Sequence, residues 1–151
     1  MKKLLLILSI PLLIGCAKKD NTNKVIFVKY NESGTLTEVE PIKMKEVAIE
    51  NKIDSLFYVG SETCSGCIEL RGKLSKWCSD NKGTIYYIPS STINSENLHY
   101  ITESAVGEFG WQDKQTLPVV FFFKGGELII STGYDNTMKS IDQYVGVLPQ
   151  N

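Results

Sequence analysis

The chain has 151 residues, of which 42% are hydrophobic, and its 16 basic and 17 acidic side chains give a formal net charge of −1 at pH 7. A chain of this length can bury one ordinary hydrophobic core, so a second domain is not expected. The balanced charge provides no basic stripe along the sequence, which argues against nucleic acid as a partner.

The N-terminal segment differs in composition from the rest of the chain. Lys2 and Lys3 precede an apolar stretch over residues 4–14. A charged start followed by about eleven mostly apolar residues is too short to span a bilayer and is typical of a secretory signal. We therefore predict a signal peptide over residues 1–15.

The end of this stretch, Leu13-Ile14-Gly15-Cys16, resembles the cleavage box of bacterial lipoproteins. The resemblance implies that Cys16 becomes the lipidated N-terminus of the mature protein, and two acyl chains on one residue suffice for stable anchoring. The alternative is an ordinary secreted protein cleaved near Gly15. The first interpretation places the protein on the extracytoplasmic face of the cell membrane, where cytosolic reductants do not keep thiols reduced.

Polar and charged residues over 16–24 predict a lipidated N-terminus and flexible tether, followed by a folded domain over residues 25–151. Within that domain we expect a first strand over residues 25–30. A turn at 31–34 would return the chain as a partner strand over 35–39.

A helix is expected next, over residues 42–51, with Pro41 at its start. Its partly buried residues would be Ile42, Val47 and Ile49. Residues 53–60 then form an apolar run rich in β-branched and aromatic side chains, which predicts a buried strand ending at Gly60.

Two cysteines, Cys64 and Cys67, lie where this strand gives way to another helix. The inward stripe of that helix would be Cys67, Leu70, Leu74, Trp77 and Cys78. Backbone N–H groups at a helix start have no intrahelical partner, and together with the helix dipole they favour a thiolate. A thiolate at this position suits thiol–disulfide exchange.

The spacing of the two cysteines leaves three interpretations. A disulfide that closes so short a loop stabilises a fold only weakly, so it suits exchange better than a passive cross-link. Zinc would usually require four ligands, and Cys78 and His99 form no second pair. We therefore favour a redox-active disulfide between Cys64 and Cys67, with no metal and no other cofactor.

For the two remaining residues, Cys78 and His99, we favour a structural role over a functional one. Cys78 lies three helical turns beyond Cys67, about 16 Å away at about 1.5 Å per residue, which argues against direct exchange between them. We expect a buried free thiol; the alternative is a third, resolving cysteine. His99 is expected to be a surface or half-buried side chain.

The second half of the chain continues the alternation of strands and helices. Residues 84–88 predict a strand stopped by Pro89, followed by a helix capped by Ser95 that ends near Gly107 or Gly110. The inward residues of that helix would be Leu98, Ile101, Ala105 and Val106. Trp111, just after it, could be a packing residue or part of an apolar surface near the cysteines.

Residues 116–130 predict a strand, a Gly-Gly turn and another strand, with Pro118 leading the first. A final helix would be capped by Asp135-Asn136-Thr137. Its inward residues would be Met138, Ile141, Tyr144, Val145 and Leu148.

This order of elements resembles the thioredoxin fold over residues 42–148. The most specific pieces are Cys64-Ser65-Gly66-Cys67 and Leu117-Pro118. The resemblance implies an α/β protein, a three-layer α/β/α sandwich whose central mixed sheet carries a β-hairpin led by a cis-proline. It also implies that Cys64 is the exposed nucleophile, that Cys67 resolves the mixed disulfide, and that an extended substrate docks beside Leu117 and Pro118.

The chain departs from thioredoxins proper at several positions around the cysteines. Tyr58 stands where they have a buried aspartate, Thr63 where they have tryptophan, and Ser65-Gly66 where they have Gly-Pro. Glu62 is near enough in sequence for its charge to oppose a Cys64 thiolate. These features are more similar to the thioredoxin-like lipoproteins of Gram-positive bacteria, a group that includes bacteriocin transport accessory proteins, which help disulfide formation in exported peptides.

Taken together, these features predict an extracytoplasmic, membrane-anchored thiol–disulfide oxidoreductase. Its partners would be thiols or disulfides of exported proteins or peptides, the membrane through the lipid on Cys16, and a redox protein in the membrane. The direction of exchange is left open. The alternative is a non-catalytic surface lipoprotein that uses the same scaffold to bind a partner.

Overall fold

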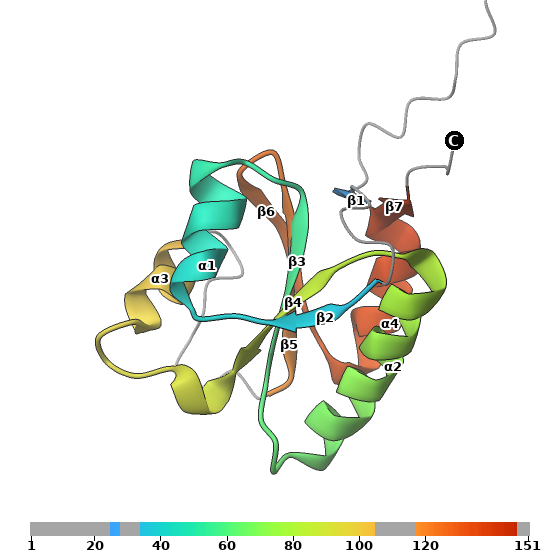
Figure 1. The fold of residues 1–151 in the computed structure, drawn as a ribbon, viewed down its shortest axis with the longest axis horizontal. Coiled ribbons are helices and arrows are strands. Elements are labelled where there is room, and N and C mark those ends of the chain that lie inside the picture. Colours follow the sequence, from blue (N-terminus) through green and yellow to red (C-terminus); the bar gives the residue numbers. More distant parts are fainter. Residues whose placement is uncertain (1–24, 28–33, 105–116, 148–151) are drawn as a thin grey trace, which may run out of the picture.

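The computed structural model describes residues 25–27, 34–104 and 117–147 (Figure 1). The predicted signal peptide, Cys16, the tether and Trp111 lie outside these residues. The elements in chain order are β1 (Val25–Phe27), β2 (Leu36–Glu38), α1 (Ile42–Met44), η1 (Lys45–Glu50), β3 (Ser55–Gly60), α2 (Ser65–Asn81), β4 (Ile85–Pro89), η2 (Ser90–Thr92), α3 (Leu98–Ser104), β5 (Val119–Lys124), β6 (Glu127–Gly133), α4 (Tyr134–Tyr144) and β7 (Val145–Val147).

A five-stranded mixed sheet in the order β2-β4-β3-β5-β6 forms the middle layer. β2, β4 and β3 run parallel, whereas β5 is antiparallel to β3 and β6 is antiparallel to β5. Helices α2 and α4 cover one face of the sheet, and α1, η1 and α3 cover the other (Figure 1). This arrangement confirms the predicted three-layer α/β/α fold.

The central strand β3 is buried along its whole length because helices cover both of its faces. Leu56 and Tyr58 pack toward α2 and α4, while Phe57 and Val59 pack into the cluster on the α1 and α3 side. A strand buried on both faces has no polar alternation, which explains the continuous apolar run in the sequence.

The predicted hairpin between residues 25–30 and 35–39 is wrong. β2 pairs in parallel with β4, and β1 pairs in parallel with β7. Gly34, expected in a hairpin turn, instead lies against the C-terminal half of α2, where an added Cβ would collide with the Cys78 carbonyl. Its φ of 54° and missing side chain let the chain pass α2 and deliver Leu36 to the core.

The helix predicted over residues 42–51 is present as α1 followed by the wider π-helical turns of η1. Met44, Val47 and Ala48 are buried, whereas Ile42, expected inward, is 39% exposed. A π-helix has more residues per turn than an α-helix, so an inward stripe extrapolated at α-helical spacing misplaces some of its members.

The cysteine-bearing helix α2 agrees closely with its predicted pattern. Cys67, Leu70, Leu74 and Cys78 are buried, and Trp77 packs partly buried against the same cluster. The helix ends at Asn81, and Lys82 follows in a left-handed conformation with a φ of 54°.

The caps of the two later helices differ from the prediction. Ahead of α3, the side chain of Asn94, not of Ser95, accepts hydrogen bonds from the backbone N–H groups of Glu96 at 2.9 Å and Asn97 at 3.1 Å. Asparagine and serine are both good capping residues, so sequence alone does not choose between neighbours. The expected inward residues Ala105 and Val106 lie outside the described residues, as do Gly107 and Gly110.

Helix α4 begins at Tyr134, one residue before the predicted cap, and Gly133 is its N-cap without a side-chain bond. Thr137 is buried and donates to the Gly133 carbonyl at 2.8 Å, so it belongs inside the helix. Val145, expected on this helix, is the first residue of β7, and Leu148 lies outside the described residues. Among the described helices, none combines the length and apolar character needed to cross a bilayer.

Candidate functional site

The candidate site lies where β3 ends and α2 begins. Cys64 is the N-cap of α2, with extended backbone, and its sulfur accepts a hydrogen bond from the backbone N–H of Cys67 at 3.2 Å. The sulfur thus occupies the place that a serine or aspartate oxygen takes at other helix starts. Because the first N–H groups of a helix need an acceptor, this position favours negative charge on the sulfur.

A second segment, distant in sequence, approaches the same sulfur. The thiol of Cys64 donates to the Leu117 carbonyl oxygen across 3.8 Å. The Leu117-Pro118 peptide bond is cis, as the resemblance implies. Leu117 is partly buried and Pro118 is buried. The structure therefore brings Cys64, Cys67, Leu117 and Pro118 together at one end of the sheet.

The two thiols of the pair have opposite environments. Cys64 is partly exposed, whereas Cys67 is fully buried. Hydrogen bonds from the side chain and the backbone of Cys67 lower the pKa of Cys64. Burial, with a further contribution from the hydrogen bond to Cys64, raises the pKa of Cys67. The accessible sulfur is therefore the one that ionises more readily, which is the property expected of an attacking nucleophile.

Tyr58 lies directly behind the pair. Its buried hydroxyl donates to the Cys67 carbonyl at 2.9 Å. Gly60 makes this possible, because an added Cβ there would collide with the Tyr58 hydroxyl. Burial raises the pKa of Tyr58, so the phenol stays protonated and serves as a donor, not as a base. Sequence reasoning identified Tyr58 as a departure but did not predict this hydrogen bond.

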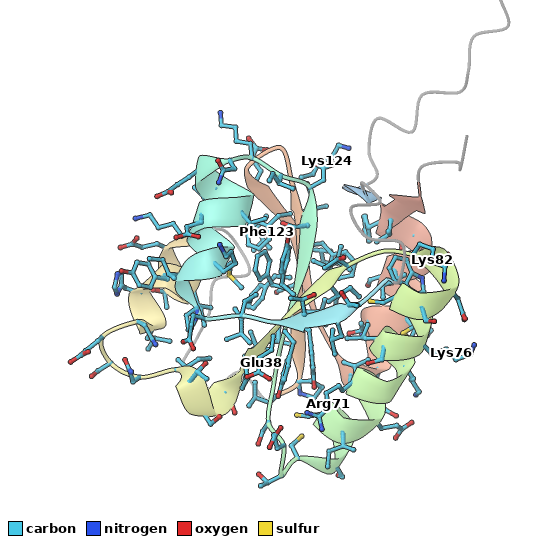
Figure 2. All side chains as sticks on the ribbon, viewed as in Figure 1. Glu38, Arg71, Lys76, Lys82, Phe123 and Lys124 are labelled. Atoms are coloured by element: carbon cyan, nitrogen blue, oxygen red, sulfur yellow. The ribbon has the colours of Figure 1, made fainter. Side chains whose placement is uncertain are left out.

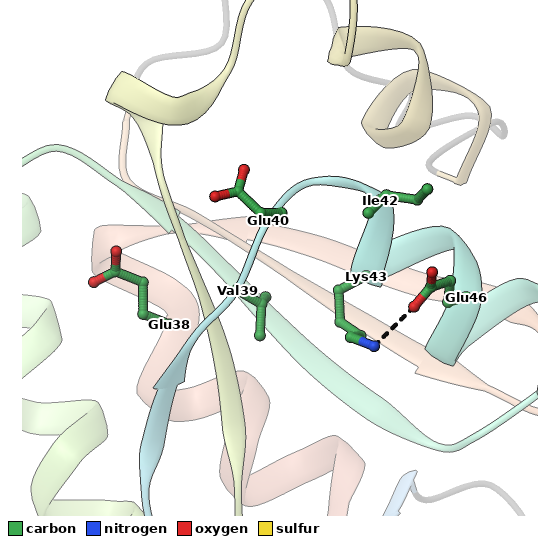
Figure 3. Close-up of a pocket in the computed structure, with 6 residues that line it drawn as sticks. All are labelled: Glu38, Val39, Glu40, Ile42, Lys43 and Glu46. Atoms are coloured by element: carbon green, nitrogen blue, oxygen red, sulfur yellow. Dashed lines mark hydrogen bonds and ion pairs between the residues drawn. The ribbon is translucent and has the colours of Figure 1, made fainter.

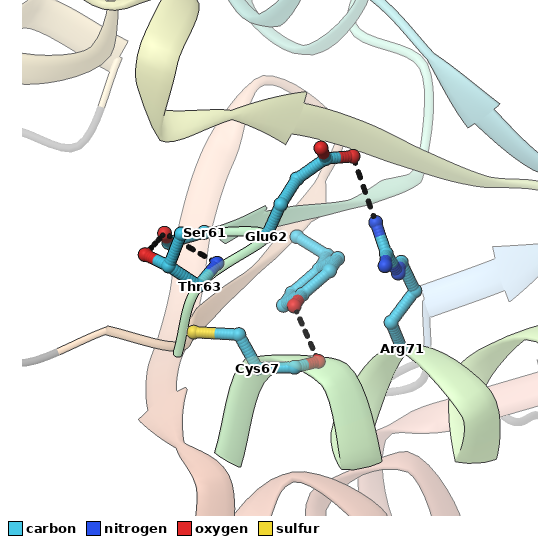
Figure 4. Close-up of polar contacts among 6 residues, drawn as sticks. Ser61, Glu62, Thr63, Cys67 and Arg71 are labelled. Atoms are coloured by element: carbon cyan, nitrogen blue, oxygen red, sulfur yellow. Dashed lines mark hydrogen bonds and ion pairs between the residues drawn. The ribbon is translucent and has the colours of Figure 1, made fainter. Parts of the chain in front are cut away.

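The carboxylate of Glu62 pairs with a cation on α2. It lies 3.4 Å from Nη1 of Arg71, which is on α2 one turn after Cys67. In Figure 4 the Glu62 side chain extends toward that guanidinium. Arg71 also lies over the ring of Tyr87, 5.7 Å from its centroid. The expected opposition between Glu62 and a Cys64 thiolate stays a prediction: in the folded site Glu62 has a cation as its neighbour, and the pKa of Cys64 is lowered by its hydrogen bonds with Cys67.

Cys78 and His99, which were not expected to take part in exchange, lie apart from this site. Cys78 is a buried free thiol whose pKa burial raises to about 11. His99 is exposed, with its ring 3.9 Å from that of Tyr100. Within the described ranges no three or more His, Cys, Asp or Glu side chains gather as metal ligands would.

A cavity of about 510 Å³ lies elsewhere on the molecule, over the end of β2 and the start of α1 (Figure 3). Its lining residues are Glu38, Val39, Glu40, Ile42, Lys43 and Glu46. None of these side chains is a thiol. The cavity is therefore separate from the thiol site.

No protein-family model matches the chain, and no curated protein matches its sequence significantly. Solved structures resemble it in fold. Thioredoxin O1 from Arabidopsis thaliana has a TM-score of 0.56 at 15% identity, over 74% of this chain and 99% of that one. Thioredoxin f from spinach chloroplast has a TM-score of 0.53 at 15% identity, over 74% and 95%. Thioredoxin from Schistosoma mansoni has a TM-score of 0.53 at 11% identity, over 74% and 99%. The chain has the thioredoxin fold.

Proposed function

We propose that this protein is a thiol–disulfide oxidoreductase that works through Cys64 and Cys67. The observation that carries the proposal is the position of Cys64: partly exposed, at the start of α2, with its sulfur 3.8 Å from the Leu117 carbonyl and the buried Cys67 behind it. The thioredoxin fold supports the same kind of activity.

In the first step, the Cys64 thiolate attacks one sulfur of a substrate disulfide. The substrate S–S bond breaks as the new Cys64–substrate bond forms, and the departing sulfur leaves as a thiolate that takes a proton from water. The backbone N–H of Cys67, 3.2 Å from the Cys64 sulfur, stabilises the attacking thiolate.

In the second step, Cys67 gives its proton to water and attacks the Cys64 sulfur. The Cys64–substrate bond breaks, a Cys64–Cys67 disulfide forms, and the second substrate thiol is released. Two electrons pass from the protein to the substrate. The reverse sequence, in which a substrate thiol attacks the Cys64–Cys67 disulfide, oxidises the substrate instead.

Docking uses the residues that face Cys64. The backbone of Leu117 lies beside the sulfur and can bond an extended substrate segment, while Pro118 occupies the space next to Gly66, 3.9 Å from where a Cβ would stand. Hydrogen bonds to the substrate backbone recognise an extended chain and depend little on the identity of its side chains.

The setting that we propose is the extracytoplasmic face of the cell membrane. The segment ending in Leu13-Ile14-Gly15-Cys16 supports a lipid anchor on Cys16. The substrates would then be cysteines of exported proteins or peptides, as for bacteriocin transport accessory proteins. A membrane protein with its own dithiol or disulfide would reset the pair after each turnover.

Trapping variants test the proposal. Cys67→Ser should accumulate mixed disulfides through Cys64, because the resolving sulfur is missing, whereas Cys64→Ser should form none. The reduction potential of the wild-type pair should lie between about −120 and −300 mV, the range of exchange-active disulfides. A potential well below this range, with partners retained by Cys64→Ser, would instead indicate a non-catalytic binding scaffold.

A further inference from the structure

A tyrosine that follows the edge strand β6 lies beside the cysteine pair. Tyr134 is the first residue of α4, directly after Gly133 at the end of β6. A Cβ built on Gly66, between the two cysteines, would lie 3.9 Å from Cδ2 of Tyr134 and 3.9 Å from Cδ of Pro118. Gly133 approaches the same proline, since its Cβ would lie 3.7 Å from the Pro118 carbonyl oxygen. The ring of Tyr134 and the ring of Pro118 therefore flank Gly66.

The ring of Tyr134 is held in place from α2. Lys73 donates to the Tyr134 hydroxyl at 3.1 Å, and its ammonium lies 4.8 Å from the ring centroid. The same ammonium pairs with Glu69 at 2.8 Å, one helical turn earlier. Hydrogen bonds from Lys73 and Tyr134 lower the pKa of Glu69, which keeps this carboxylate charged beside the cation. The three side chains form a neutral clamp that fixes the direction of the ring.

The charges on the opposite flank of α2 are also matched, because Arg71 pairs with Glu62. The described side chains around the cysteine pair thus include two matched ion pairs, the half-buried ring of Tyr134 and the partly buried Leu117. An apolar side chain gains free energy by covering such a ring. A charged side chain loses hydration there, and the groups it could pair with are already paired.

We propose that Tyr134 is a specificity-determining residue, which selects substrates whose reacting cysteine is flanked by an apolar side chain such as leucine or phenylalanine. This inference rests on the proposed function. The half-buried ring supplies the side wall of the docking surface next to Gly66, and the buried Pro118 lies beneath that surface. The neutral clamp of Glu69 and Lys73 keeps that wall in one orientation during binding.

The experiment uses short peptides that carry one cysteine as a mixed disulfide with thionitrobenzoate, with Leu, Ser, Lys or Asp beside the cysteine. The Cys64 thiolate attacks the peptide sulfur, the peptide–thionitrobenzoate bond breaks, and the coloured thiolate that leaves reports the rate. Each rate is divided by the rate of the same variant with hydroxyethyl disulfide, which has no side chain to place against Tyr134.

For the wild type we expect the Leu peptide to react about tenfold faster than the Asp and Lys peptides after this normalisation. Tyr134→Ala should reduce the ratio to about twofold or less, because the wall is gone. Tyr134→Phe loses the hydroxyl that Lys73 bonds but keeps the ring and its contact with the Lys73 ammonium, so it should keep the ratio. Lys76→Gln, which changes an exposed lysine further along α2, is the matched control and should also keep it.

A wild-type ratio near one, or a tenfold ratio that survives Tyr134→Ala, would overturn the inference while leaving exchange itself intact. A wild type that reacts with neither the peptides nor hydroxyethyl disulfide would overturn the proposed function instead. Circular dichroism of each variant establishes that it is folded. Should Tyr134→Ala fail to fold, Tyr134→Gln replaces the ring with a polar side chain of similar length and should likewise reduce the ratio to about twofold or less.

Discussion

At the scale of single residues, the site separates two identical side chains by their surroundings. Cys64 and Cys67 lie on the same helical turn, yet one is partly exposed and bonded to an N–H group while the other is buried. The buried thiol donates to the exposed sulfur. The low pKa of Cys64 and the high pKa of Cys67 are therefore linked and belong to the pair.

The first prediction concerns this link. Replacing Cys67 with alanine removes the thiol that donates to Cys64, so the pKa of Cys64 should rise toward the free-cysteine value of about 8.5. The pH dependence of Cys64 alkylation measures the pKa. Both proteins should carry Cys78→Ala, so that Cys78 adds no signal to the titration. Equal midpoints in the two proteins would show that the side chain of Cys67 does not stabilise the thiolate.

A second prediction concerns Cys78, whose pKa is raised by burial to about 11 from 9.0. The folded state holds this proton more tightly than the unfolded state does. Its contribution to stability, about 2–3 kcal/mol, is therefore complete below about pH 9 and is lost as the pH rises through about 11. Urea unfolding at pH 8 and pH 11 should show a smaller loss of stability for Cys78→Ala than for the wild type. An equal loss in both would contradict a buried, protonated Cys78.

At the scale of elements, two interactions join the strand and loop before the cysteines to the helix that bears them. Tyr58 on β3 bonds the Cys67 carbonyl, and Glu62 in the loop pairs with Arg71 on α2. Both act on the first turns of α2, so they fix the helix start relative to the sheet.

The third prediction tests the tyrosine bond. Tyr58→Phe keeps the ring and its stack on Tyr87, at 5.2 Å between centroids, but removes the hydroxyl. The loss of one buried hydrogen bond should lower the free energy of unfolding by about 0.5–1.5 kcal/mol. Chemical denaturation measures it. Tyr144→Phe, on α4, is the control that also removes a tyrosine hydroxyl. If both substitutions lower the free energy of unfolding equally, the hydrogen bond from Tyr58 to Cys67 has no particular stabilising effect.

The fourth prediction tests the ion pair by a double-mutant cycle. Arg71→Gln leaves the Glu62 carboxylate without its cation two residues before Cys64, so the pKa of Cys64 should rise by a few tenths of a unit. Adding Glu62→Gln should reverse this rise. The pair Lys76 and Asp80, further along α2, provides the matched cycle and should leave the pKa of Cys64 unchanged; Lys76 and Arg71 are labelled in Figure 2. If Arg71→Gln acts equally with and without Glu62, the electrostatic explanation fails.

How far the sequence predicts these elements depends on how local the determining interaction is. β3, α2 and the β5–β6 hairpin each have their own hydrophobic pattern or turn signal, and the structure confirms all three. The pairing of β1 with β7 joins segments about 120 residues apart, which no local pattern indicates. A turn signal with two short flanking strands favoured a hairpin instead.

At the functional site, too, the residues with a local sequence signal could be predicted and the others could not. The spacing of Cys64 and Cys67 could be identified from the sequence, and Pro118 came with the resemblance. The bond from Tyr58 to Cys67 required the fold, since only the packing of β3 under α2 brings the two together. Tyr134 carried no signal at all, because its neighbours Gly66 and Pro118 belong to two other segments of the chain.

At the scale of the whole molecule, the thiol site and the two-stranded sheet lie at opposite ends. β1 and β7 pair near the C-terminal end of α4, whereas the first turn of α2 lies at the far end in Figure 1. A tether that enters through β1 would therefore hold the site away from its point of attachment, which suits the membrane setting proposed above. The five-stranded sheet that positions Cys64 and Pro118 does not include β1.

The last prediction follows from this separation. Proline substituted singly at Ile26 and at Phe27 removes the backbone donor at two successive residues. One of the two should break a β1–β7 hydrogen bond, since alternate residues of a strand bond a given neighbour. That variant should lose a modest part of its stability, about 1 kcal/mol, yet exchange with hydroxyethyl disulfide at the wild-type rate. Phe57→Pro, in the buried central strand, should abolish both folding and exchange because it breaks the ladder that supports the cysteine pair. A loss of exchange in a folded Ile26→Pro or Phe27→Pro protein would show that the small sheet and the thiol site are coupled across the molecule, contrary to the separation that the topology indicates.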